Sequence, residues 1–188
     1  MEPTAPTLAA TEPHVDLKLA AIGAVGGIVA AMVMDVFSRV AREWESAPVR
    51  RAAEPDASVA VGTAAFKSVA GYTPGPETRQ WLGTAAHYAF SAAVGVNYLL
   101  ASERAPELRR GYGTVYGSLV WATAEETAAP ALGLSKTPDR VPLGAHAHGL
   151  SAHWVYGATL ETFRRVASGV LASWEDSRRV IDTSAVRV

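Results

Sequence analysis

Apolar residues gather into four blocks along the chain, and polar stretches containing Pro and Arg separate the blocks. The first block carries no charged residue between Lys18 and Asp35, and the second carries none at all. The third and fourth blocks each contain carboxylates. All four rely on Ala and Gly more than on Leu, Ile and Phe, and they cover residues 19–37, 82–101, 111–130 and 146–174.

The length of these blocks favours helices that cross a membrane. About 20 mostly apolar residues span a bilayer as a helix. In a soluble bundle, an uncharged run as long as the first block would leave an apolar face against water. We therefore predict an all-α protein with four transmembrane helices in an up-down bundle, whose main partner is the lipid bilayer. The predicted helices cover about residues 17–38, 82–101, 111–129 and 146–172.

The segments outside these helices differ in character. The acidic, Pro-rich leader over residues 1–16 is predicted to be disordered, because it offers little apolar surface to bury. In the loop over residues 39–80, the stretch "DASVAVGTAAFKSVAG" begins with a good N-cap at Asp56. It predicts a short helix over about residues 56–70 on the membrane surface. Residues 175–188 are expected to form a polar tail.

Composition and motifs narrow the classes of function. A chain of 188 residues fits one domain, and a formal net charge of -1 gives no reason to expect a nucleic-acid partner. The absence of Cys excludes disulfides, thiolate metal sites and cysteine nucleophiles. No G-x-S-x-G nucleophile motif, phosphate-binding loop or dinucleotide fingerprint is present. These observations favour a protein that is not an enzyme.

The arginines set the expected orientation of the helices. Arg104, Arg109 and Arg110 lie in the short second loop, and Arg164 and Arg165 close the fourth helix. Positively charged residues mark the cytoplasmic ends of membrane helices. Both termini and the second loop are therefore expected on the cytoplasmic side.

Small residues recur at the spacing that lets helices approach closely. Gly23 and Gly27 form one G-x-x-x-G pair, and Gly113 and Gly117 form another. In lipid, such pairs allow close contact between helix backbones. They predict helix crossings within the chain, and the same faces would allow a homo-oligomer.

The titratable residues are expected to meet at one end of the bundle. In an up-down bundle, the end of one helix lies beside the start of the next helix along the chain. At 100° per residue, His146, His153 and Glu161 share one stripe of the fourth helix, whereas His148 points away. Ionisable residues inside a membrane usually face the bundle interior and mark functional sites. The residues placed at this end are Asp35, His87, Glu125, Glu126, His146, His148 and His153.

Three roles are consistent with this polar face. One is proton or ion handling, because histidine titrates near neutral pH and an adjacent carboxylate tunes it; the candidates are His87, Glu125, His153, Glu161 and Asp35. Another is a Zn, Fe or Mn site; its candidate ligands are His87, His146, His153 and Glu125. No cofactor is expected for the protein as a whole, and a divalent metal at this site is the possible exception. The third is structural, with His87, His153 and Glu161 hydrogen-bonding between helices. A soluble or peripheral bundle with a metal site is the alternative to the membrane protein.

Several short motifs, taken in order, resemble a known family. They are "HYAFS" at His87, "ASERAP" with Glu103 and Arg104, Gly113 and Gly117, "PALGL", "AHW" at His153, and "LETFRR" with Glu161, Arg164 and Arg165. In order and spacing, residues 87–165 resemble the YagU family of bacterial inner-membrane proteins, whose biochemical function is unassigned. The resemblance implies a multi-pass protein of the bacterial inner membrane and no known activity. It does not extend to Asp35, Glu125 or His146.

Overall fold

The computed structural model describes residues 17–52 and 57–185 of the chain. Within these residues the protein is all-helical and contains no strand, which confirms the predicted all-α class. The predicted disordered leader lies outside the described residues.

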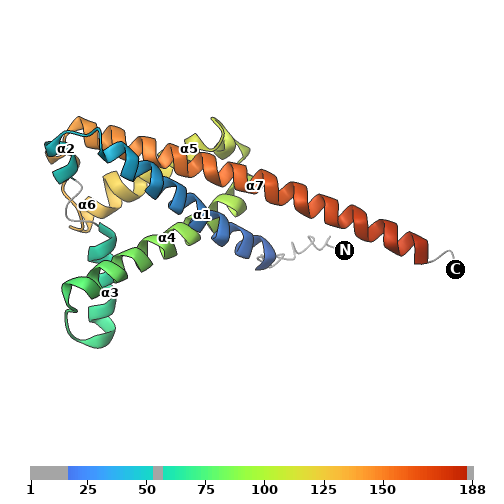
Figure 1. Cartoon of the computed structure of the whole chain (residues 1–188), viewed down its shortest axis with the longest axis horizontal. Coiled ribbons are helices and arrows are strands. Elements are labelled where there is room, and N and C mark those ends of the chain that lie inside the picture. Colours follow the sequence, from blue (N-terminus) through green and yellow to red (C-terminus); the bar gives the residue numbers. More distant parts are fainter. Residues whose placement is uncertain (1–16, 53–56, 186–188) are drawn as a thin grey trace, which may run out of the picture.

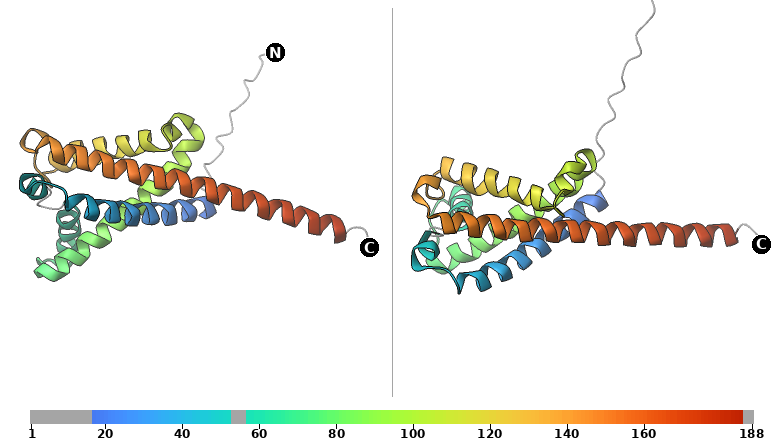
Figure 2. Two further views of the ribbon diagram at one scale, coloured as in Figure 1. Left: turned by 45° about the horizontal axis from the view of Figure 1, so that its top comes forward. Right: turned by 90° about the horizontal axis from the view of Figure 1, so that it is seen from above.

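Four long helical segments run back and forth in the order expected for an up-down arrangement (Figures 1 and 2). The third segment is composite: an α-helix continues into a π-helical stretch and then into a last α-helical turn. The segments are α1 (Leu17–Arg42), α4 (Pro76–Arg104), α5–η2–α6 (Thr114–Val120, Trp121–Ala128 and Ala129–Ala131) and α7 (Leu143–Ala185).

Short helices connect these segments. The helix α3 (Ala57–Ala70) lies where a short helix was predicted in the first loop, and it packs against the start of α4 through Gly62 and Gly83. The other connections are α2 (Ala47–Ala52) and the 3-10 turns η1 (Pro106–Arg109) and η3 (Pro138–Arg140).

Two helices are longer than the apolar pattern predicted. Helix α4 begins at Pro76, where Gly75 is the N-cap and proline suits the first helical turn. Helix α7 continues to Ala185 instead of ending near residue 172, so it includes most of the segment predicted as a polar tail. In Figure 1 the last turns of α7 project beyond the other helices. Hydropathy alone does not mark this end of α7, because polar residues can also continue a helix.

The predicted glycine pairs lie at the two closest helix crossings. A Cβ atom on Gly27 would overlap the backbone of Ser91, so α1 and α4 meet at backbone contact distance. Likewise, a Cβ on Gly117 would overlap the backbone of His153, and one on Gly157 would overlap that of Gly113. Helix α1 thus packs between α4 and α7, and α5 packs on the far side of α7.

The core is built from small residues and tyrosines. Ala30 and Ala31 of α1 are fully buried, as is Tyr98 of α4. Around them lie further buried side chains: Leu99, Tyr116, Tyr156 and Leu160. Larger aliphatic side chains are mostly excluded, because the glycine crossings leave little space between the helices.

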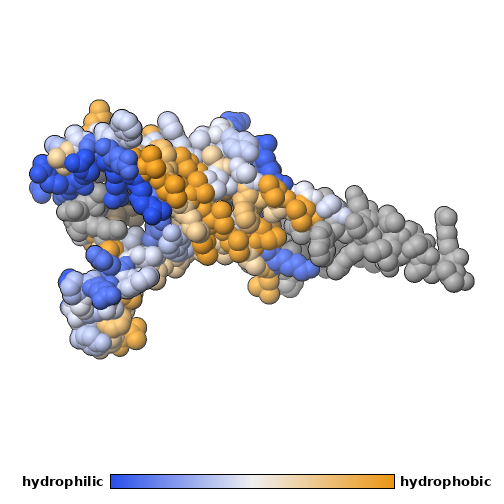
Figure 3. Space-filling view, in the orientation of Figure 1, coloured by the Kyte–Doolittle hydropathy of each residue, from blue (hydrophilic) through white to orange (hydrophobic). Residues whose placement is uncertain are grey.

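Helix α1 presents an apolar face to the outside. Val25, Met32, Val36 and Val40 are each more than half exposed, and Figure 3 shows the resulting apolar band across the middle of the molecule. Among the described helices, α1 alone is long and apolar enough to cross a membrane, with a mean hydropathy of 2.1 over a stretch that is 28% buried. The four-span arrangement stays a prediction.

Candidate functional site

Every histidine in the described residues lies beside a carboxylate from another segment of the chain. Three of the four contact distances are 3.4 Å or shorter, and the fourth is 3.9 Å. The pairs are His87–Asp35 at 3.4 Å, His146–Glu126 at 2.9 Å, His148–Glu45 at 2.6 Å and His153–Glu125 at 3.9 Å. The four pairs differ in whether both ring nitrogens of the histidine already make hydrogen bonds.

His146 is held on both sides of its ring. Its Nδ1 lies 2.9 Å from the Glu126 carboxylate, and its Nε2 lies 3.1 Å from the carbonyl oxygen of Pro138. Both partners only accept hydrogen bonds, so full bonding requires a proton on each nitrogen, which is the imidazolium form. His146 thereby connects the N-terminal end of α7 to η2, through Glu126, and to η3, through Pro138.

His148 lies on another side of α7 and joins it to the end of α1. Its Nδ1 is 2.6 Å from the carboxylate of Glu45. Its ring also stacks on Phe37, with ring centroids 6.3 Å apart. Like His146, His148 acts as an anchor between segments.

A cavity of about 290 Å³ separates α4 from η2 and α7. His87, Glu125 and His153 line it, and so do Ser91 and Tyr156. Apart from Ser58 of α3, the rest of its wall is apolar, with Ala, Val, Leu, Met and Phe side chains from α1, α3, α4, the third segment and the turn after it. None of the lining residues in the described chain is Lys or Arg. The structure therefore brings three of the predicted site residues to one cavity.

His153 has a defined tautomer and a free nitrogen. Its Nδ1 lies 2.9 Å from the carbonyl oxygen of Gly149, and a carbonyl only accepts, so Nδ1 carries the proton. Nε2 then faces Glu125 Oε1 at 3.9 Å, which is too long for a hydrogen bond. The side chain of His153 is buried, whereas that of Glu125 is 52% exposed. Gly149 provides the space beside this pair, since a Cβ there would lie 2.9 Å from Glu125 Oε2 and from Trp121 Nε1.

His87, which also lines the cavity, forms a second and closer pair with Asp35. Its Nε2 is buried, lies 3.4 Å from Asp35 Oδ1 and makes no hydrogen bond. The other oxygen of Asp35 accepts a 2.8 Å hydrogen bond from the Tyr88 hydroxyl. The Asp35 carboxylate is thus held by Tyr88, and the imidazole beside it keeps an unsatisfied nitrogen.

The π-helical stretch η2 explains how two adjacent glutamates both reach α7. In a π-helix each backbone N–H bonds to the carbonyl five residues back, instead of four as in an α-helix, so the turns are wider. Here the N–H of Ala129 bonds to the carbonyl of Ala124. Successive side chains are therefore closer in direction than in an α-helix, and Glu125 and Glu126 face His153 and His146 respectively. Pro130, just beyond η2, lacks the N–H that an α-helical turn would use. This proline within an apolar block is the sequence signal that could have revealed the π-helix.

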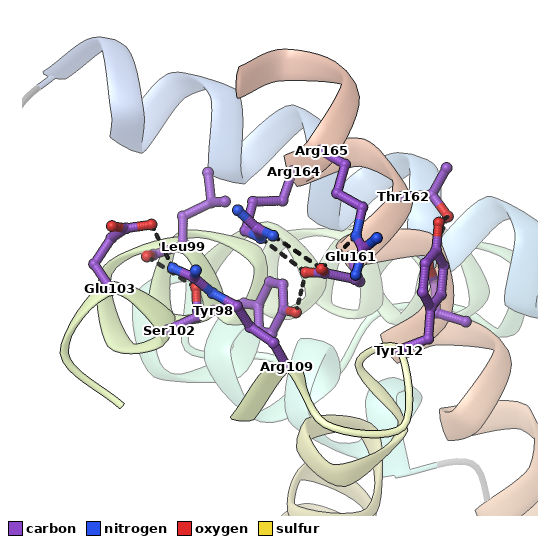
Figure 4. A network of polar contacts seen from close by, with 11 residues as sticks. Tyr98, Leu99, Ser102, Glu103, Arg109, Tyr112, Glu161, Thr162, Arg164 and Arg165 are labelled. Atoms are coloured by element: carbon purple, nitrogen blue, oxygen red, sulfur yellow. Dashed lines mark hydrogen bonds and ion pairs between the residues drawn. The ribbon is translucent and has the colours of Figure 1, made fainter. Parts of the chain in front are cut away.

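Glu161 belongs to a different cluster. It lies two helical turns beyond His153, about 12 Å along α7, and its side chain is fully buried. Its carboxylate accepts hydrogen bonds from the Tyr98 hydroxyl at 2.7 Å, from Arg164 at 2.8 and 2.9 Å, and from Arg165 at 2.7 Å (Figure 4). All four acceptor positions of a carboxylate are thereby used. His153 and Glu161 were predicted to share one stripe of α7. They contact different partners, Glu125 for His153 and Tyr98 with the two arginines for Glu161.

A turn of left-handed backbone covers this cluster. Gly111, Tyr112 and Gly113 have φ angles of 60°, 59° and 87°. The middle position is unusual for a residue with a side chain. It places the Tyr112 ring beneath Arg165, whose guanidinium carbon lies 4.6 Å from the ring centre. The sequence analysis did not identify this contact.

A family model described as "Protein of unknown function (DUF1440)" matches residues 25–162. The chain belongs to the DUF1440 family. No curated protein and no solved structure matches the chain. The DUF1440 segment includes both cavity pairs and Glu161, and it ends just before Arg164 and Arg165.

The four metal ligands predicted for this DUF1440 protein do not come together. His87, His153 and Glu125 line the cavity, but His146 is bonded to Glu126 and Pro138. In the part of the chain that the structure describes, no group of three or more His, Asp or Glu side chains is placed to hold one metal ion. The cavity instead combines the carboxylate of Glu125 with the imidazoles of His87 and His153. In the described residues, Nε2 of each imidazole makes no hydrogen bond.

Proposed function

We propose that this DUF1440 protein is a multi-pass protein of the bacterial inner membrane, of the YagU kind, that binds and releases protons at the cavity. His153 and Glu125 form the exchanging pair, and His87 with Asp35 forms a second pair beside it. His146 and His148 anchor α7 and take no part in the exchange.

One observation carries this proposal. The Nε2 of His153 is a proton acceptor that the fold leaves without a hydrogen bond, 3.9 Å from a carboxylate and at the edge of a cavity. Imidazole changes charge near neutral pH, and a neighbouring carboxylate favours the charged form. A proton arriving at Nε2 would draw Glu125 into an ion pair, and its loss would free Glu125 again.

The arrangement of polar and apolar residues supports a membrane location. Helix α7 rises about 27 Å from His146 to Arg164, at 1.5 Å per residue, which is close to the thickness of a hydrocarbon core. Among its described side chains, Glu161 is the one carboxylate between these ends, and it is fully buried. The outward apolar face of α1 and the glycine crossings are both typical of helices in lipid. The arginines around Glu161 favour a cytoplasmic location for both termini, because positively charged residues are enriched at the cytoplasmic ends of membrane helices.

Carbonate extraction tests the membrane location. The full chain, expressed in a bacterium, should stay with the membrane pellet after an alkaline carbonate wash and should require detergent for release. A chain recovered in the wash would instead support the soluble or peripheral bundle.

Proton handling is tested in liposomes that contain the purified protein and a pH-sensitive dye. An imposed pH difference should decay faster with the wild-type protein than in empty liposomes. The variants Glu125→Gln and His153→Gln should return the decay close to that of empty liposomes. The matched control is Glu103→Gln, which alters an exposed ion pair with Arg109 at the far end of the bundle. Equal traces for wild type, Glu125→Gln and His153→Gln would leave the cavity pairs with a structural role alone.

A further inference from the structure

We propose that the cavity between α4, η2 and α7 binds a small organic cation, with the Glu125 carboxylate as its counter-ion. The occupant is a compact ammonium ion that carries apolar groups, such as a substituted alkyl or benzyl amine.

The charge of the cavity selects a cation. Glu125 is the one carboxylate that lines it, and no Lys or Arg side chain of the described residues joins the lining. In the described chain the Glu125 carboxylate makes no hydrogen bond, and His153 at 3.9 Å is its sole ionic neighbour. The nearby carboxylates are engaged: Asp35 by Tyr88, and Glu126 by His146. Glu125 is thus available to pair with a ligand.

The size and wall of the cavity select an organic ion rather than a bare metal ion. A volume of about 290 Å³ lies at the small end of ligand pockets. A hard divalent ion requires several oxygen ligands, and the described residues assemble no such group here. The apolar wall, which includes Val94 and Val120, suits methyl or methylene groups around the charge. The rings of Phe90 and Tyr156 also line the cavity, and aromatic faces attract quaternary ammonium ions.

Protonation of His153 would compete with this cation. The titratable groups facing His153 are Glu125 from η2 and His87 from α4, with Asp35 of α1 behind His87. Helix α3 contributes no titratable side chain to the lining. A charged imidazole would pair with Glu125 and oppose a second positive charge in the cavity. Cation affinity therefore rises as the pH rises. This coupling rests on the proposed function, whereas cation binding itself rests on Glu125 and the cavity.

Calorimetric titration of the full chain in neutral detergent tests both parts. The probe is benzyltrimethylammonium, and its neutral isostere neopentylbenzene and the anion benzenesulfonate are the comparison ligands. We expect the cation to bind and the anion and the neutral isostere to bind at least about tenfold more weakly, given the strength of charge-assisted contacts. Equal binding of cation and neutral isostere would overturn the proposal.

Two neighbouring glutamates provide a matched pair of variants. Glu125→Gln should weaken binding of benzyltrimethylammonium by about tenfold or more. Glu126→Gln, one residue along the same π-helix but outside the cavity lining, should leave the affinity unchanged. Circular dichroism of both variants verifies that they are folded. Unchanged affinity in folded Glu125→Gln, or an equal loss in both variants, would overturn the assignment of Glu125 as counter-ion.

The coupling to protons is read from titrations at about pH 5.5 and about pH 8, which bracket imidazole protonation. Wild-type affinity should be higher at the upper pH, and His153→Gln should show a smaller difference, because His87 is then the one imidazole of the described residues left in the lining. If His153→Gln keeps the full pH dependence of the wild type, the coupling through His153 is overturned. Proton flux in liposomes without the probe separates the two proposals. Flux with no cation binding overturns the cation site alone, and cation binding with no flux overturns the proposed function alone.

Discussion

The hydroxyl of Tyr98 on α4 donates a 2.7 Å hydrogen bond to the fully buried carboxylate of Glu161 on α7. In the described structure, this bond and the 2.8 Å bond from Tyr156 to the carbonyl of Ser91 are the two hydrogen bonds that join α7 to α4. Tyr156 and Ser91 line the cavity, whereas Tyr98 and Glu161 lie outside its lining, and the two helices otherwise touch little. These two hydrogen bonds therefore set the distance between α4 and α7, and the width of the cavity depends on that distance.

Removing either tyrosine hydroxyl tests this role. Tyr98→Phe should lower the free energy of unfolding by about 1.5–3 kcal/mol, because its acceptor is a charged carboxylate. Tyr156→Phe should lower it by about 1 kcal/mol, because its acceptor is a neutral carbonyl. Both variants keep the ring, so packing is preserved. Denaturation in detergent micelles measures the two losses, and the order would be reversed if Tyr156 were the stronger link.

The two arginines that bind Glu161 should contribute unequally. The Arg164 side chain is 16% exposed and makes two hydrogen bonds to Glu161, whereas the Arg165 side chain is 57% exposed and makes one. Loss of a partner from a buried pair costs about 3–5 kcal/mol, and exposed pairs contribute about 1 kcal/mol or less. Arg164→Gln should therefore destabilise the protein far more than Arg165→Gln in the same unfolding measurement. The double variant Glu161→Gln with Arg164→Gln should lose less than the sum of its single variants. Strict additivity would show that the two side chains act independently.

Glycines on the same helix should respond in opposite ways to alanine. A Cβ on Gly157 would overlap the backbone of Gly113, whereas one on Gly169 would meet nothing within 4 Å. Gly157→Ala should cost about 1–3 kcal/mol or more, because α5 and α7 must separate. Gly169→Ala should leave stability unchanged or raise it by up to about 1 kcal/mol through helix propensity. Thermal unfolding of both variants checks the contrast. Tolerance of alanine at Gly157 would mean that the α5–α7 crossing is looser than described.

Part of the candidate site could be predicted from the sequence, because helical periodicity fixes which side chains share a face. His153 and Glu161 were expected on one stripe of α7, and His148 on another side. Periodicity does not say which neighbour each side chain meets. Glu161 meets Tyr98 and Arg164, whereas His153 meets Glu125, although both lie on the same helix. The His146–Glu126 clamp also depends on the π-helix, which the apolar pattern does not distinguish from an α-helix.

The sequence by itself determined the all-helical class, the order of the long helices and the glycine faces at which they cross. These features follow from local chemistry: apolar blocks set helix position, and glycine spacing sets where backbones can approach. The tertiary structure alone decided which carboxylate pairs with which histidine and where a cavity remains. Those outcomes depend on the relative height and rotation of helices distant in the chain. A shift of one residue in the turn near Pro130 would change them without altering the apolar pattern.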